Sequence, residues 1–402
     1  MSRKRGVYVL GACRTPFGKF FGLFKDVPAP CLAAAAIKGL YKSLNLPPAF
    51  SSIGGLVLGQ VYFAGVGQAP VKQAALLAGL SKTVNSVSVN KVCASSLYAL
   101  QAASREIQIG EAGLMLAGGM ENMSRAPYLL ERRDKKVGPE WSVMSRQLLK
   151  GDEPLMYDSM IFDGLLDTTT SKWRTMGELA DMCAEVHAIS REAQEAYARA
   201  SFERVLSTRE AGAFDRQICD KEAKDECVRH LDSEKIKGLK PAFSQNGTVT
   251  AATSSQIADG AAVLLLGDSR TARKMRISPQ ARLVDFVSFN QDPIWYTTSP
   301  VGAIRDLLGR NRLAVKDIDF FEINEAFAVV PIYAMRELGI PFEKVNVWGG
   351  AISLGHPLGA SGARLVMNIV QQLREIGGRY GIACACHGGG GAMAILIKNM
   401  QS

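Results

Sequence analysis

The chain has 402 residues, of which 47% are hydrophobic and 21% are charged, a composition typical of a globular protein large enough for two or three domains. No apolar run approaches the ~20 residues that a membrane-spanning helix needs, and no signal-peptide core follows the basic residues 3–5. The formal net charge of +9 favours an anionic partner. We therefore expect a cytoplasmic protein whose eight cysteines are reduced thiols.

Short β-branched runs alternate with helical patterns over the first 120 residues. The pattern predicts strands at 7–10, 56–61, 86–90 and 114–118, and helices at 29–44, 68–80 and 93–109. This alternation is typical of an α/β layered domain with a largely buried sheet.

From about residue 124 to residue 250 charged residues dominate and clear β runs are absent. One strong helix is expected at 190–211, and we interpret the segment as an inserted, loop-rich subdomain. Its basic cluster at 132–136 is either a solvated loop or a contact for a phosphorylated substrate or cofactor. No aromatic residues interleave this cluster, which argues against nucleic acid.

Strand–helix alternation resumes after residue 250. Strands are predicted at 261–266, 281–289, 318–323, 345–348, 382–386 and 392–397, with helices at 301–309, 325–338 and 359–376. The order of elements indicates two similar α/β halves around an insertion. The predicted domains are 1–123, 124–250 and 251–402.

A cysteine stands between a predicted strand and the helix that follows it, in the motif Asn90–Ser96. The first backbone N–H groups of a helix lack intrahelical partners and carry the positive end of its dipole. A thiol there is expected to have a lowered pKa, which would make Cys93 a nucleophile. A small buried apolar cysteine is the structural alternative.

Only four histidines are present, and His187 and His230 lie where a structural or solvated role is expected. His356 differs, because it lies in the glycine-rich stretch 349–364, just before a proline and a predicted helix. A histidine on such a rigid loop is suited to act as the base for a cysteine nucleophile.

The stretch Cys384–Gly391 joins two cysteines and a histidine to four glycines. This stretch has three possible interpretations: a metal site, a redox pair, or a catalytic thiol beside an oxyanion-binding turn. No second Cys/His group has zinc-finger spacing, and the two-residue spacer of redox pairs is missing. A glycine turn with exposed N–H groups fits acyl chemistry best. Asn324 and Glu325 follow another predicted strand, where helix capping and dipole pairing are the simple explanations.

Taken together, these motifs resemble those of the thiolase family. The matching stretches are Asn90–Ser95, Gly118–Ser124, Asn324–Phe327, Gly355–Pro357 with Gly359–Gly362, and Cys386 with its glycines. The resemblance runs from Arg14 almost to the C-terminus. It implies the α/β thiolase fold, with two βαβαβαββ halves in stacked helix and sheet layers and a loop domain between them.

The resemblance also implies a mechanism. Cys93 would carry the acyl group as a thioester, His356 would deprotonate it, and Cys386 would be the acid/base for the second substrate. One oxyanion hole would come from His356 and a water held by Asn324, the other from the N–H groups of Cys93 and Gly388. The implied substrates are acyl-CoA and coenzyme A, with no tightly bound cofactor and no metal.

Positions matching the family's CoA contacts are weaker candidates. Ser255, counted from Asp259, falls at the serine that contacts pantetheine, and Leu165, Met176 and Phe327 match residues lining the tunnel. Core packing is the alternative for Leu165 and Met176. A homodimer or homotetramer is expected by resemblance, with no nucleic-acid partner.

Several residues depart from the family's usual pattern: Ser96, Thr175, Trp295, Tyr296 and His387, together with a longer segment at 131–158. They leave the acyl-chain length open. Two other functions remain as alternatives: a ketoacyl-synthase-like condensing enzyme on the same fold, and a non-catalytic acyl-CoA or lipid-binding protein.

Overall fold

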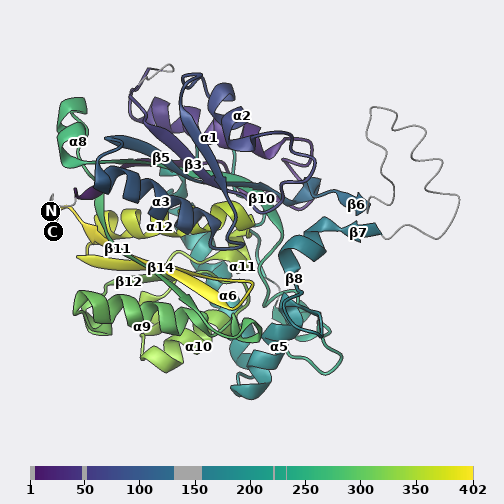
Figure 1. Cartoon of the computed structure of the whole chain (residues 1–402). Coiled ribbons are helices and arrows are strands. Elements are labelled where there is room, and N and C mark those ends of the chain that lie inside the picture. Colours follow the sequence, from purple (N-terminus) through teal and green to yellow (C-terminus); the bar gives the residue numbers. More distant parts are fainter. Residues whose placement is uncertain (1–4, 48–51, 131–155, 221, 232, 402) are drawn as a thin grey trace, which may run out of the picture.

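The computed structural model describes residues 5–47, 52–130, 156–220, 222–231 and 233–401 (Figure 1). The basic cluster at 132–136, and most of the segment 131–158, lie outside the described residues.

Ten strands form one continuous sheet. In spatial order they are β12 (Phe320–Ile323), β13 (Tyr380–His387), β14 (Gly391–Asn399), β11 (Ala281–Asn290), β1 (Val7–Arg14), β10 (Ala258–Gly267), β5 (Leu114–Asn122), β3 (Gly55–Gly59) and β4 (Asn85–Val89), while β2 (Gly18–Lys19) pairs with β10. The predicted strands are confirmed with shifted ends, apart from 345–348.

The two halves of this sheet repeat one topology. In the first half β1 lies beside β10, followed by β5, β3 and β4; in the second, β11 lies beside β14, followed by β13 and β12. Val345 completes the second half with a single bridge to Phe321. The strand expected at 345–348 is wrong, because Asn346 has a φ of 47° and ends the extended backbone.

The halves join where β1 pairs antiparallel with β11. The division at 124 and 250 stays a prediction, although β10 follows the second of these points and pairs with β1 and β5 of the N-terminal part.

Helices cover both outer faces and fill the space between the two halves (Figure 1). Those outside the first half are α1 (Ala29–Ser43) and α2 (Pro70–Leu77), those outside the second are α9 (Ser299–Asn311) and α10 (Val329–Leu338), and the central pair is α3 (Ser95–Ile109) and α12 (Leu358–Glu375). The helix expected at 325–338 starts later, at Val329. Shorter elements are α8 (Ser269–Met275), α11 (Ala351–Leu354) and the 3₁₀ turns η1 (Met123–Arg125), η3 (Phe214–Arg216), η4 (Pro293–Trp295), η5 (Val315–Asp317) and η6 (Phe342–Lys344).

The insertion contains more regular structure than its sequence indicates. Its elements are β6 (Tyr128–Leu130), β7 (Met156–Asp158), the π-helical turn η2 (Met160–Leu165), β8 (Leu166–Asp167), β9 (Arg174–Thr175), α5 (Met176–Val186), α6 (Arg191–Glu210) and α7 (Ser233–Lys237). Helix α6 confirms the one expected helix. Helix α5 was not predicted, although Thr175 and Glu178 form a capping box that marks its start.

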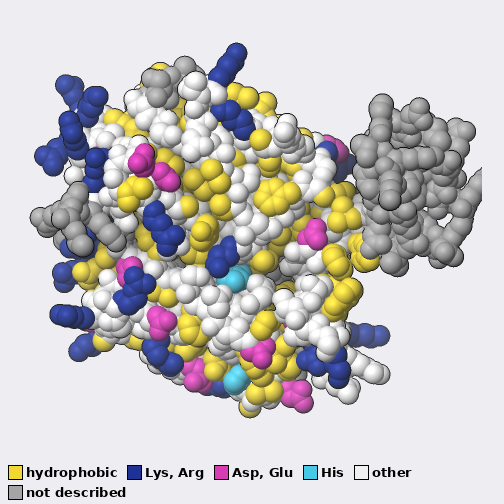
Figure 2. All heavy atoms as spheres, viewed as in Figure 1, with side chains coloured by type: hydrophobic (Ala, Val, Ile, Leu, Met, Phe, Trp, Pro, Cys, Tyr) yellow, Lys and Arg dark blue, Asp and Glu magenta, His cyan; other side chains and the backbone are white. Residues whose placement is uncertain are grey.

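The central core explains why α3 and α12 hold their places. Leu97 and Leu100 of α3 and Val366 and Ile369 of α12 are completely buried in one cluster between the two halves of the sheet. Burial of each such side chain contributes about 1.5–3 kcal/mol. No helix within the described residues is long and apolar enough to cross a membrane. On the visible surface, Lys and Arg side chains gather over α8 (Figure 2).

The start of α12 presses directly against β5. A Cβ on Gly119 of β5 would stand 1.8 Å from the carbonyl oxygen of Gly359. Two backbones therefore meet where any side chain would separate them.

We expect Gly119→Ala to lower the free energy of unfolding by about 1–3 kcal/mol, because the added methyl group forces β5 and α12 apart. Urea unfolding followed by circular dichroism measures the loss. Gly309→Ala is the matched control, since Gly309 lies in α9 with nothing within 4 Å of the new Cβ. It should raise stability by about 0.5–1 kcal/mol. Equal stabilities of the two variants would contradict the close approach.

Candidate active site

Cys93 lies in a tight turn between β4 and α3. The preceding residue, Val92, has a φ of 48°, a strained conformation for a β-branched side chain. Side chains hold this turn: Asn90 Oδ1 accepts from the Val92 N–H at 2.9 Å, and Ser95 Oγ donates to the Val92 carbonyl at 2.6 Å. Cys93, a half-buried residue, follows directly after this strained position.

The environment of the Cys93 thiol contains two opposing effects. Burial dominates and raises its pKa to about 12, although the backbone N–H groups of Cys93 and Gly388 point at the sulfur and favour the thiolate. The lowered pKa expected from the helix start is therefore wrong, because desolvation outweighs the N–H groups. Cys93 rests as a thiol.

The His356 imidazole is buried and held in one orientation. Its Nδ1 lies 2.6 Å from Ser361 Oγ, and that hydroxyl donates to the Pro357 carbonyl at 2.9 Å. Because the serine hydroxyl donates its proton to Pro357, it can only accept from the imidazole, so Nδ1 carries the hydrogen and Nε2 is unprotonated. Burial and the Arg364 charge lower the pKa of His356 to about 3. The ring is a neutral base.

Asn324 places its amide beside that lone pair. Its Nδ2 lies 3.2 Å from Nε2 of His356, and its backbone N–H donates to the Cys384 carbonyl at 2.8 Å. The side-chain Oδ1 is buried, with no hydrogen-bond partner in the described part of the chain. A buried acceptor of this kind is suited to hold a water molecule.

Cys386 is completely buried on β13, close to Cys93. Burial and the neighbouring Cys93 raise its pKa well above that of a free thiol. Cys384 lies on the same face of β13 and also has a pKa raised by burial. No group of three or more His, Cys, Asp or Glu side chains that would hold a metal ion is found among the described residues.

The residues expected to contact CoA fall into two groups. A Cβ on Gly388 would be 3.7 Å from both the Met176 sulfur and a Val92 methyl group, so Met176 lies beside the Cys93 turn. The Ser255 N–H donates to the Ala326 carbonyl at 3.0 Å, which brings this serine beside Phe327. Leu165 ends the turn η2 and is half-buried, and its place in a tunnel stays a prediction.

The departures from the usual pattern have local explanations. Ser96 Oγ accepts from the Ala363 N–H at 2.9 Å and thereby links α3 to α12. Thr175 caps α5. The Tyr296 hydroxyl donates to the Met176 carbonyl at 2.8 Å, and its ring is buried near both Cys93 and Cys386.

Glu121 is a positioning residue that the sequence analysis missed. Its buried carboxylate accepts from the N–H groups of Val61 at 2.9 Å, Tyr62 at 3.2 Å and Gly359 at 2.9 Å. It therefore ties β5 to the loop after β3 and to the helix behind His356. Burial raises its pKa to about 7. A glutamate after two glycines at the end of a buried strand was the available signal.

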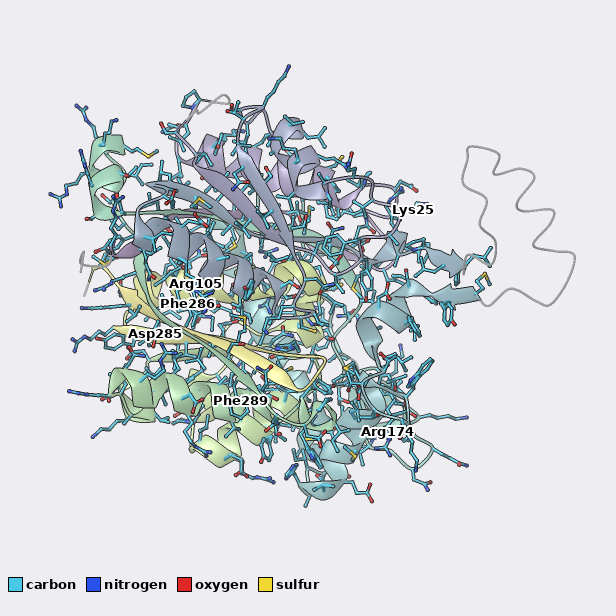
Figure 3. All side chains as sticks on the ribbon, in the orientation of Figure 1. Lys25, Arg105, Arg174, Asp285, Phe286 and Phe289 are labelled. Atoms are coloured by element: carbon cyan, nitrogen blue, oxygen red, sulfur yellow. The ribbon has the colours of Figure 1, made fainter. Side chains whose placement is uncertain are left out.

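A pocket of about 790 Å³ lies between α5 and the loop 244–248, and Cys93, His356 and Cys386 are not among its lining residues. Arg174, labelled in Figure 3, is at its edge, but Glu178, Asp181 and Glu185 also line it. Three carboxylates make it unsuited to an anionic ligand. The candidate site therefore consists of the neighbouring thiols of Cys93 and Cys386, with His356 linked to the strand of Cys386 through Asn324.

Two neighbouring thiols and backbone N–H groups directed at one of them are features suited to acyl transfer, as is the neutral imidazole linked to the strand of Cys386 through Asn324. The chain matches the models for "Thiolase, N-terminal domain" over residues 7–270 and "Thiolase, C-terminal domain" over residues 277–399. It belongs to the thiolase family.

Similar proteins cover the whole chain. It is 40% identical to acetyl-CoA acetyltransferase 2 of Arabidopsis thaliana over 98% of this chain and 97% of that protein. It is 41% identical to a probable acetyl-CoA acyltransferase of Staphylococcus aureus, over 98% and 99%.

Two solved structures have the same fold. The Acat5 thiolase of Ascaris suum in complex with coenzyme A is 34% identical, with a TM-score of 0.89 over 98% of this chain and 100% of that one. The acetyl-CoA acetyltransferase of Bacillus anthracis is 32% identical, with a TM-score of 0.90 over all of both chains. The fold and family expected from the motifs are confirmed.

Alkylation of Cys93 by iodoacetamide should rise about tenfold per pH unit between about pH 6 and 9, because only the thiolate reacts and its pKa lies far above this range. Mass spectrometry of the peptide carrying Cys93 measures this rate separately from the other cysteines. A rate that levels off below about pH 8 would instead indicate a resting thiolate paired with protonated His356.

Proposed function

We propose that this protein is a thiolase that cleaves 3-ketoacyl-CoA with coenzyme A, and that it also runs the reverse condensation of two acetyl-CoA molecules. The observation that carries the proposal is the closeness of two cysteine thiols, Cys93 and Cys386. The neutral base His356 is linked to the strand of Cys386 through Asn324, whose side chain binds the imidazole and whose backbone N–H donates to the Cys384 carbonyl. The Arabidopsis acetyl-CoA acetyltransferase and the coenzyme A complex of the Ascaris thiolase support this substrate class.

In the first half-reaction the Cys93 sulfur attacks the C3 carbonyl of the substrate while Nε2 of His356 takes the thiol proton. The carbon–carbon bond between C2 and C3 then breaks, leaving the acyl group on Cys93 as a thioester. The departing acetyl-CoA carbanion takes the proton of Cys386. The high pKa of the Cys386 thiol suits it to protonate a carbanion.

In the second half-reaction coenzyme A enters as a thiol. Cys386, now a thiolate, takes its proton, and the coenzyme A sulfur attacks the thioester on Cys93. Cys93 leaves and recovers its proton from His356. Both catalytic thiols and the imidazole return to their neutral starting states, so atoms and charges balance over the cycle.

Two sets of donors would stabilise the oxyanions. The N–H groups of Cys93 and Gly388 already point at the Cys93 sulfur, so they suit the oxygen of a group bonded to it. The second set is Nε2–H of His356, once protonated, with a water held by Asn324. This set would hold the thioester oxygen of acetyl-CoA as its enolate forms.

We assign CoA contacts to Ser255, Met176, Phe327, Gly388 and Leu165, in keeping with the positions of Met176 and Gly388 beside Cys93. The acyl group would reach the space bounded by Tyr296. The protein is further proposed to be a homo-oligomer of the cytoplasm, where its eight free cysteines stay reduced.

The first test is CoA-dependent loss of acetoacetyl-CoA absorbance, extended to ketoacyl chains from C4 to C16. We expect cleavage that iodoacetamide abolishes, and no activity for Cys93→Ala. The absence of cleavage at every chain length would overturn the thiolase proposal. Cleavage by Cys93→Ala would overturn the nucleophile alone.

Separating the two half-reactions tests the remaining roles. Cys386→Ala should still form an acetyl-enzyme from acetyl-CoA, detectable by mass spectrometry, although more slowly because coenzyme A then leaves as a thiolate without a proton from Cys386. It should lose net turnover. Asn324→Ala should lower kcat by about 10²–10³, the typical loss of one oxyanion donor. A ketoacyl-synthase-like enzyme has no need of the second thiol, so full turnover by Cys386→Ala would favour that alternative.

A further inference from the structure

His387 stands directly after the catalytic candidate Cys386, where an aliphatic residue is usual in the family that this chain resembles. It ends β13, and the next four residues, 388–391, are all glycine. These glycines form the tip of the β13–β14 hairpin, with Gly389 and Gly390 both at a φ of 83°. The chain thus places a bulky polar ring directly before four glycines, the residue type with the greatest backbone freedom.

The His387 ring is packed into the hairpin and fixed there. Only 6% of the residue is exposed, and Nδ1 donates to the Gly388 carbonyl at 2.7 Å. A carbonyl only accepts, so the proton is on Nδ1. The edge of the ring that carries Nε2 packs against Gly391, where an added Cβ would stand 2.2 Å from Nε2. Nε2 itself is buried, with no hydrogen-bond partner in the part of the chain that the structure describes.

The hydrogen bond from His387 fixes the backbone of a residue that the reaction uses. Gly388 directs its N–H at the Cys93 sulfur, and its carbonyl is the group that His387 binds. A glycine explores far more backbone conformations than other residues, so an isolated glycine turn would spread this N–H over many directions. Holding the carbonyl restricts ψ of Gly388 and, with it, the position of the hairpin tip relative to Cys93.

We propose that His387 is a positioning residue that locks Gly388, through the hydrogen bond from Nδ1 to its carbonyl, so that the Gly388 N–H stays aimed at the Cys93 sulfur. The inference rests on the proposed function and adds the group that preorganises one of its oxyanion donors. Preorganisation is what makes such donors effective, because they do not have to reorient during the reaction.

A direct proton-transfer role fits the surroundings of the ring less well. His387 points to the opposite face of β13 from Cys386, since neighbouring residues of a strand alternate. Burial and the Lys91 charge lower its pKa to about 4, although the bond to Gly388 opposes this shift. The ring therefore stays neutral, and its bond to the Gly388 carbonyl persists through the neutral pH range.

Two variants with the same number of side-chain heavy atoms separate positioning from packing. His387→Asn keeps an N–H donor on the same γ carbon, whereas His387→Leu has a similar volume and no donor. Both lose the ring contact with Gly391. We expect the Leu variant to lower kcat for acetoacetyl-CoA cleavage about tenfold with little change in KM, and the Asn variant to recover most of this loss.

Iodoacetamide alkylation of Cys93 at fixed pH gives a readout that does not depend on turnover. A misdirected Gly388 N–H stabilises the thiolate less, so the Leu variant should react several-fold more slowly than the Asn variant and the unchanged protein. Thermal unfolding of all three proteins identifies a variant that has lost its fold.

Each outcome bears on one idea only. Equal activity and equal alkylation in all three proteins would overturn the positioning role. Equal impairment of the Asn and Leu variants would also overturn it and would assign the effect to ring packing. An unchanged protein that cleaves no ketoacyl-CoA would overturn the proposed function, while the alkylation comparison would still test the aim of the Gly388 N–H.

Discussion

The buried Glu121 carboxylate is the interaction on which the geometry of the site depends. It binds three backbone N–H groups, those of Val61, Tyr62 and Gly359, which come from distant parts of the chain. Burial of a carboxylate without such partners would be costly, so these three segments must stay together for the fold to keep it. The close contact of Gly119 with Gly359 reinforces the same junction. Through it, the helix behind His356 is held against the half of the sheet that leads to Cys93.

In the site assembled in this way, the Cys93 thiol and the His356 imidazole are both uncharged before substrate binds. Burial raises the pKa of Cys93 to about 12 and lowers that of His356 to about 3, so thiol and imidazole are both neutral before substrate arrives. In the proposed mechanism the thiolate therefore forms only as the substrate carbonyl is attacked, and the N–H groups of Cys93 and Gly388 stabilise the charge that follows. A resting thiol is also protected from chance alkylation, since the thiolate is the reactive form.

Both proposed oxyanion-binding arrangements include a neighbouring residue that is not assigned to bind the substrate. Ser361 fixes the tautomer of His356 by using its own proton on the Pro357 carbonyl. His387 is proposed to do the corresponding work for Gly388, in a hairpin tip of four glycines that has little rigidity of its own. The glycines allow the backbone to approach the Cys93 sulfur. In this proposal the hydrogen bond from His387 restricts the backbone conformations that the glycines would otherwise explore.

The amino-acid sequence by itself determined the architecture and the family, and it named the candidates for the reacting groups. Hydrophobic periodicity located nearly all the strands and helices of both halves, and five ordered motifs named Cys93, His356, Cys386 and Asn324. These features can be recognised from the sequence because periodicity and motif spacing depend only on residues that are near one another along the chain.

Only the tertiary structure decided how these residues behave. It reversed the expected pKa shift of Cys93, because desolvation depends on neighbours far away in the sequence. It gave Glu121 its role, since its three partners come from other segments, and it reduced the strand expected at 345–348 to one bridge. Helix α5 was missed although the capping box of Thr175 and Glu178 marks its start and most of its residues are buried in the folded protein. Contacts between distant segments determine which side chains are buried, and burial determines the pKa values of these side chains.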